Sequence, residues 1–101
     1  MSQNPAPSDQ LDPLLHQPVR TRLTAFLKAR GQTSFRELKQ ALEVSDGNLD
    51  SHMKKLLAAD YVTVEKNTGR GRAQSLYALT DKGEAAFVSY VANLQKLLSG
   101  D

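Results

Sequence analysis

Apolar residues recur at helical spacing along most of this chain and alternate in one part of it. This pattern predicts a mainly α fold with a small β hairpin. After Pro18, apolar residues occur at i, i+4, i+7 and i+8, namely Val19, Leu23, Phe26 and Leu27. Pro18 suits the first turn of a helix and Gly31 suits its end, because glycine accepts a left-handed conformation. We therefore expect a helix between these two residues. A short helical segment should precede it, with apolar residues at Leu11, Leu14 and Leu15.

Two further helices are predicted by N-cap signals at Ser34 and Ser45, with Thr33 as a brief edge strand before them. Ser34 and Glu37 form an S-x-x-E capping box. The apolar stripe behind it is Phe35, Leu38, Ala41 and Leu42. The buried face predicted after Ser45 is Leu49, Met53, Leu56 and Leu57. The opposite face is polar and consists of Asn48, Ser51, His52 and Lys55. Residues 34–60 are thus predicted to form a helix-turn-helix.

Two β-rich segments follow, at residues 61–66 and 74–79, and they predict an antiparallel hairpin. The intervening NTGRGRA contains two glycines and two arginines, Arg70 and Arg72, so we expect a flexible loop rather than a two-residue turn. Together with Lys66 on the first strand, these arginines give the hairpin a basic tip. Residues 61–80 are therefore interpreted as a wing.

The last predicted helix begins behind Thr80, an N-cap with Asp81 and Glu84 near the positive end of the helix dipole. Its apolar residues are spaced 4, 3 and 4 apart, which is typical of a coiled-coil seam. They are Phe87, Val91, Leu94 and Leu98. Val88 extends the stripe beyond what one domain needs to cover its core. We therefore predict that residues 81–98 form a dimerisation helix, with Leu11, Leu14 and Leu15 packed beside it.

The composition narrows the range of functions. The chain has 101 residues, enough for one domain over residues 11–98 behind a flexible polar leader at residues 1–10. It has no Cys, and His16 and His52 are far apart, so we expect neither a metal site nor a cofactor. No nucleophile–base pair or phosphate-binding glycine loop is recognisable, which argues against an enzyme. Since no apolar run has membrane-spanning length and the leader is not a signal peptide, we expect a cytoplasmic protein.

The charges are distributed unevenly, although the net charge is only +2. Five cations and no acid lie between Asp12 and Glu37, and three cations and no acid lie between Glu65 and Asp81. Such asymmetry favours one basic face, as a nucleic-acid-binding protein requires. Scattered solvated charges remain the alternative interpretation.

The run GNLDSHMKKLLAADYV, the basic loop behind it and the segment LYALTDKGEAAF resemble the winged-helix transcriptional regulators of bacteria and archaea. The similarity is greatest to small members related to the MarR family. It implies a homodimer that binds two half-sites of double-stranded DNA through the third helix and the wing, with terminal helices pairing the subunits. Fuller members of that family often bind small aromatic acids in a pocket. Because the terminal elements here are short, a small-molecule effector is left open.

The candidate DNA-binding residues lie on the third helix and the wing. They are Asn48, Ser51, His52, Lys55, Lys66, Arg70 and Arg72. Polar side chains of these types read base edges or hold phosphates. Asp46 and Asp50 would repel phosphate unless they cap the helix or form ion pairs. The alternatives are an ordinary solvated helix face with a polar hairpin tip, and a winged helix that contacts only proteins.

Overall fold

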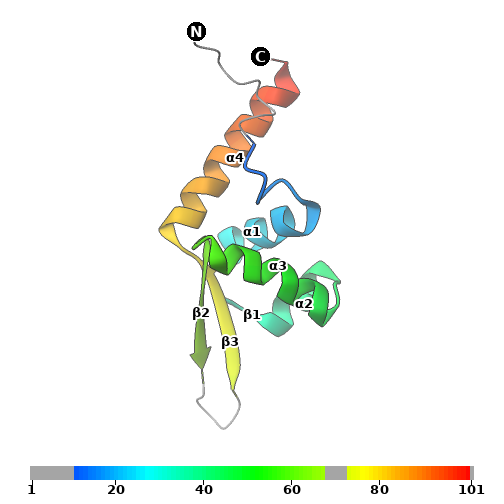
Figure 1. Ribbon diagram of the computed structural model, residues 1–101, viewed down its shortest axis with the longest axis vertical. Coiled ribbons are helices and arrows are strands. Elements are labelled where there is room, and N and C mark those ends of the chain that lie inside the picture. The colour runs from blue at the N-terminus through cyan, green and yellow to red at the C-terminus, as the bar shows by residue number, and fades with distance from the viewer. Residues whose placement is uncertain (1–10, 68–72, 101) are drawn as a thin grey trace.

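The computed structural model describes residues 11–67 and 73–100, and these form a winged helix-turn-helix (Figure 1). The predicted class, mainly α with a small β wing, is confirmed. In chain order the elements are α1 (Pro18–Arg30), β1 (Thr33–Ser34), α2 (Phe35–Leu42), α3 (Asp46–Ala58), β2 (Val62–Asn67), β3 (Gln74–Leu79) and α4 (Asp81–Ser99). α4 extends from one end of the molecule and the β2–β3 hairpin from the other. The predicted leader at residues 1–10 lies outside the described residues.

Three of the four helices begin at the predicted caps. Ser34 Oγ accepts from the Glu37 N–H at 3.1 Å, and the Glu37 carboxylate accepts from the Ser34 N–H at 3.2 Å, which completes the capping box. Ser45 Oγ accepts from the Asn48 N–H, and Thr80 Oγ1 accepts from the Gly83 N–H. Each bond satisfies an N–H that the helix itself leaves without a partner. These caps fix where α2, α3 and α4 start.

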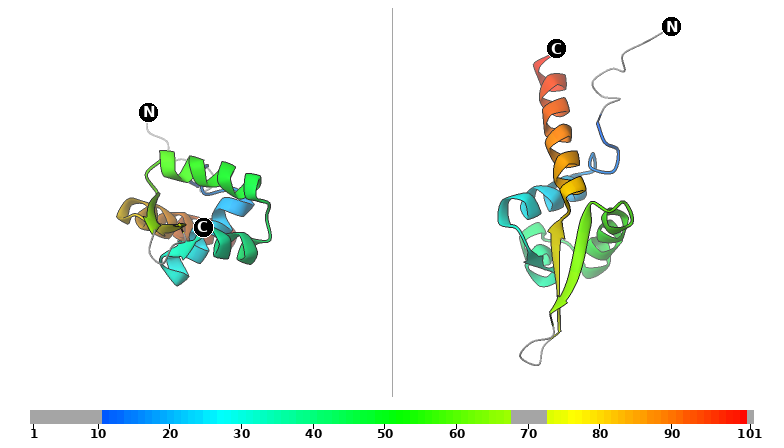
Figure 2. Two further views of the ribbon diagram at one scale, coloured as in Figure 1. Left: turned by 90° about the horizontal axis from the view of Figure 1, so that it is seen from below. Right: turned by 90° about the vertical axis from the view of Figure 1, so that its left-hand side faces the viewer.

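The sheet has the strand order β1-β3-β2, with antiparallel pairing throughout. Val62 pairs with Leu79 at the base of the hairpin and Asn67 pairs with Gln74 toward its tip. The expected edge strand at Thr33 is present and pairs with Tyr77. β3 packs on α1 and β2 on α3, so the base of the hairpin lies between these helices (Figure 2, right). The rest of β2 is exposed, because it runs out beyond the helices.

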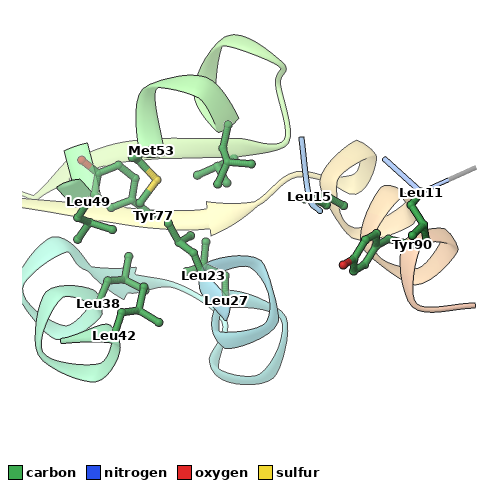
Figure 3. Packing of buried hydrophobic residues seen from close by; sticks show 12 residues of the cluster. Leu11, Leu15, Leu23, Leu27, Leu38, Leu42, Leu49, Met53, Tyr77 and Tyr90 are labelled. Atoms are coloured by element: carbon green, nitrogen blue, oxygen red, sulfur yellow. The ribbon is translucent and has the colours of Figure 1, made fainter. Parts of the chain in front are cut away.

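The core joins the apolar faces of the first three helices to the sheet (Figure 3). Its fully buried members on the helices are Leu23 and Leu27 of α1, Leu38 of α2, and Leu49, Met53 and Leu56 of α3. These are the residues that helical spacing selects. Leu57, also predicted for the buried face, is only half-buried. A second part of the core lies at α4, where Leu11 and Leu15 flank Tyr90.

The segment before α1 is a turn, so the prediction of a short helix there was wrong. Asp12 Oδ1 accepts from the Leu14 N–H at 2.9 Å, and the Asp12 carbonyl accepts from the His16 N–H at 2.8 Å, which closes a single turn. The turn does not continue into a helix because Pro18 disfavours helical backbone at Gln17, which is extended. Gln17 instead caps α1, since its side-chain oxygen accepts from the Arg20 N–H. The segment from Leu11 to Gln17 therefore forms a turn that leads into α1.

This turn is bound to other parts of the domain by side-chain hydrogen bonds. Asp12 accepts from the Tyr61 hydroxyl at the start of the wing, and the Leu15 carbonyl accepts from the Thr21 hydroxyl of α1. His16 Nδ1 lies 2.9 Å from the Tyr90 hydroxyl of α4. The hydrogen bond to Asp12 and partial burial raise the pKa of Tyr61 to about 12. The turn thus connects α1, α4 and the wing.

Candidate nucleic-acid interface

The exposed side of α3 carries the polar residues that the sequence singled out, apart from His52. Leu49, Met53 and Leu56 are buried on the opposite side of the helix. Asn48, Ser51 and Lys55 are exposed. Asn48 lies in the first turn, where its N–H is held by Ser45. Because the buried face fixes the rotation of α3, these three side chains have to face away from the body of the domain.

The two acids on α3 form ion pairs with lysines. Lys39 Nζ lies 2.8 Å from Asp46 Oδ1, and Lys54 Nζ lies 3.1 Å from Asp50 Oδ2. Exposed pairs of this kind contribute little to stability. They do offset the negative charge next to Asn48 and Ser51. Because Asp46 and Asp50 form ion pairs, their charges are compatible with a phosphate-binding surface.

His52 differs from its neighbours on α3 because it is half-buried and has a partner inside the domain. Its Nδ1 lies 2.9 Å from Nη1 of Arg20 on α1. Burial, and then the charges of Arg20 and Lys55, lower the pKa of His52 from its ordinary value of 6.5. These causes all favour the neutral ring. The sequence suggested a solvent-facing side chain, whereas one ring nitrogen of His52 contacts α1.

Arg20 is a residue that the sequence did not single out as a site residue. It belongs to the acid-free cluster of cations before Glu37, but nothing in its spacing indicates a contact with a residue 32 positions later. Its Nε donates to the Leu14 carbonyl at 2.6 Å. The guanidinium is thus held between the turn before α1 and the side of α3.

The wing carries one described cation near its tip. Lys66 is exposed on β2, where its Cα is opposite that of Ser75 on β3. Arg70 and Arg72 lie outside the described residues. The hairpin therefore brings a positive charge to the end of the molecule opposite α4 (Figure 1).

The predicted dimerisation residues are divided between the domain's own core and its surface. Leu11 and Leu15 are buried, and Leu14 is half-buried. Phe87, Val91 and Leu94 are partly buried against the core, whereas Leu98 is 77% exposed. An open apolar hollow of about 310 Å³ is lined by Lys28, Phe87, Val88, Val91, Ala92 and Gln95. Val88, which is 53% exposed, lies in this hollow, so apolar surface continues around α4 beyond the seam.

Within residues 11–67 and 73–100, no group of His, Cys, Asp or Glu has an arrangement suited to a metal ion. None of the described helices combines the length and the hydropathy needed to cross a membrane.

A family model for the winged helix DNA-binding domain matches residues 19–98. An uncharacterized protein of Methanocaldococcus jannaschii is 34% identical over 79 residues, which cover 78% of this chain and 86% of that protein. A transcriptional regulator homologue from Pyrococcus horikoshii has a similar structure, with a TM-score of 0.82, 28% identity and 86% of both chains covered. The YusO protein of Bacillus subtilis shares the fold, with a TM-score of 0.77, 21% identity, and 94% of this chain and 67% of that chain covered.

The chain therefore belongs to the winged helix DNA-binding domain family. The resemblance of the sequence to winged-helix transcriptional regulators is thus confirmed. The protein is a DNA-binding transcription regulator.

Proposed function

We propose that the protein binds specific sites on double-stranded DNA as a homodimer, with α3 in the major groove and the wing against the flanking backbone. The observation that carries this proposal is the orientation of α3. Its apolar face is committed to the core, and Asn48, Ser51 and Lys55 are exposed on the other side. A helix presented in this way suits the width of the major groove.

Selection from a random pool of DNA duplexes with the purified protein tests the proposal as a whole. Enrichment of a palindrome is the expected result, since a two-fold dimer binds two half-sites about 34 Å apart. An unenriched pool would contradict sequence-specific binding. It would favour the alternative of a winged helix that contacts only proteins.

Asn48 and Lys55 are expected to have different roles on this surface. Asn48 lies in the first turn of α3, the end that usually meets base edges, and its amide can pair with adenine through one donor and one acceptor. Asn48→Ala should cost about 1–3 kcal/mol on the preferred duplex and relax the preference at one base pair per half-site. Lys55 lies farther along the helix, so Lys55→Ala should weaken all sequences about equally, because it removes a charge that neutralises phosphate.

Fluorescence titration of both variants on the preferred duplex and on a random one measures this difference. The two variants serve as each other's control, because both remove an exposed side chain from the same face of α3. If Asn48→Ala lowers the affinity for both duplexes equally, or for neither, Asn48 does not read a base.

Arg70 and Arg72 are expected to supply affinity that does not depend on sequence. Replacing both with Ala should lower the affinity for specific and random duplexes alike, because arginine at a wing tip neutralises backbone phosphate. The slope of log K against log salt concentration should fall by about one for each phosphate that is no longer neutralised. Lys96→Ala removes a cation from the opposite end of the molecule and should leave the slope unchanged. A slope equal to that of the wild type in the double variant would exclude contact between the wing and the backbone.

Support for the homodimer comes from α4. Its partly buried seam continues into exposed apolar surface at Val88 and Leu98, and such surface generally marks an interface. α4 points away from the wing, so a partner bound along it would extend the molecule on the side opposite the hairpin (Figure 1).

A further inference from the structure

The side chain of Arg20 makes two hydrogen bonds in the described structure, one to a backbone carbonyl and one to a side chain of α3. Its Nε donates to the Leu14 carbonyl at 2.6 Å, and its Nη1 lies 2.9 Å from Nδ1 of His52. Its own N–H donates to Gln17 Oε1 at the start of α1. Since one end of the guanidinium is fixed to backbone, the other end has a defined position beside α3.

The chemistry of the two side chains determines where the proton of His52 lies. A guanidinium has only donors, so Nδ1 of His52 has to accept in this bond. In a neutral imidazole, the nitrogen that does not accept carries the proton. His52 is therefore the Nε2–H tautomer. An imidazolium has no acceptor and would lose the bond to Arg20.

The position of His52 on α3 places its ring beside the candidate DNA-binding face. Asn48 lies four residues before His52 and Lys55 three residues after it, and this spacing puts all three on neighbouring positions of one helix side. Because Nδ1 faces α1, Nε2 lies across the ring from that contact. His52 thus offers a single hydrogen-bond donor at the border between the body of the domain and the exposed face of α3.

We propose that Arg20 is a positioning residue for DNA recognition, which fixes His52 as an Nε2–H donor toward a hydrogen-bond acceptor on a base edge in the major groove. This inference rests on the proposed function. Suitable acceptors are N7 and O6 of guanine and O4 of thymine. Arg20 itself contacts no base in this role.

The charges around His52 favour the neutral ring. Burial, and then the positive charges of Arg20 on α1 and Lys55 on α3, lower the pKa of His52. The acids on α3 are already paired, Asp46 with Lys39 and Asp50 with Lys54. In the turn before α1, Asp12 accepts from Tyr61, and His16 is bonded to Tyr90. In these contacts, no described carboxylate pairs with His52 to stabilise its charged form.

The lowered pKa of His52 determines whether the stability of the protein rises or falls with pH. Well above pH 6.5, His52 is neutral in both the folded and the unfolded chain. As the pH falls from 6.5 toward the lower pKa of the folded protein, the unfolded chain takes up a proton first, so the free energy of unfolding falls. The Arg20–His52 bond is lost when the ring of the folded protein takes up its proton, which occurs below pH 6.5. Specific DNA affinity that depends on this bond should be fully present at pH 7.5.

Nuclear magnetic resonance of the ring nitrogens tests the positioning step without DNA. In the wild type at pH 7.5, His52 should be the Nε2–H tautomer and should titrate below pH 6.5. Arg20→Met keeps much of the aliphatic chain but removes the donors. In this variant, His52 should become a mixture of tautomers, with a pKa closer to its ordinary value. An Nδ1–H tautomer in the wild type, or a tautomer that Arg20→Met leaves unchanged, would overturn the inference.

Two replacements of His52 then test the donor itself. The His52→Gln amide lies near the position of Nε2 and can still donate, whereas the His52→Asn amide lies near Nδ1 and does not reach the groove. On the selected duplex at pH 7.5, His52→Asn should bind about 10-fold more weakly than His52→Gln, with no difference on a random duplex. Equal affinities on the selected duplex would overturn the inference and leave the proposed function intact. A wild type that binds no duplex selectively would overturn both.

Discussion

Gly83→Ala is expected to lower the free energy of unfolding by about 3 kcal/mol or more, the upper end of the range for overpacked sites. A Cβ at residue 83 would lie 2.0 Å from the carbonyl oxygen of Tyr61 and 2.8 Å from its carbonyl carbon. Both atoms are backbone, so no side-chain rotation relieves the clash. The same carbonyl accepts from the Thr80 N–H at 3.0 Å, which fixes it against α4. The start of the wing and the start of α4 would have to separate.

Gly47→Ala is the matched control, because it makes the same chemical change inside a helix. Nothing lies within 4 Å of a Cβ at residue 47 in α3. Alanine there should raise the free energy of unfolding by about 0.5–1 kcal/mol through its higher helix propensity. Urea unfolding followed by circular dichroism measures both variants. A Gly83→Ala protein as stable as the wild type would show that the wing and α4 do not approach this closely.

Val88→Glu should convert the proposed dimer into a monomer and lower affinity for a duplex with two half-sites by a factor on the order of 10² to 10⁴. The factor is large because a dimer binds its second half-site intramolecularly. Val88 is 53% exposed in the single chain, so a charge there leaves the core of the domain in place. In a dimer that covers this surface, the same charge would lose its water next to Lys28, which already pairs with Glu84, so its desolvation would oppose association.

Sedimentation at micromolar concentration gives the oligomeric state, and titration on one and two half-sites gives the loss of affinity. Ser89→Glu is the control, since Ser89 is exposed next to Val88 but does not line the apolar hollow. It should remain a dimer. A wild type that sediments as a monomer, or a Val88→Glu protein that sediments as a dimer, would contradict an interface on this face of α4.

The parts of this fold that could be predicted from the sequence depend on interactions between near neighbours. The caps at Ser34, Ser45 and Thr80 are each a side chain bonded to an N–H three residues later, a distance at which sequence pattern and geometry correspond directly. The buried leucines of α1, α2 and α3 follow from helical periodicity in the same way. The polar face of α3 follows by exclusion, once its apolar face is known.

What could not be predicted depends on which distant segments meet. Arg20 and His52 are 32 residues apart, and Asp12 and Tyr61 are 49 residues apart. Neither pair belongs to a recognisable motif, so each can be found only after the fold brings its members together. The turn at Leu11–Leu15 was predicted as a helix for a related reason. Its apolar residues have helix-like spacing, but Asp12 and Pro18 determine the local backbone.

The turn before α1 places the N-terminal boundary of this domain earlier in the chain than the family match does. The region shared with the winged helix family begins at residue 19. Before it, Leu11 and Leu15 complete the packing around Tyr90, and the Asp12 carboxylate accepts from the Tyr61 hydroxyl. A chain cut at the family boundary would leave Tyr90 uncovered at α4 and would free Arg20 from the Leu14 carbonyl. The phenol of Tyr61 would then ionise nearer pH 10 than 12. Seven residues that the family model does not include are thus structural parts of the domain, from Leu11 to Gln17.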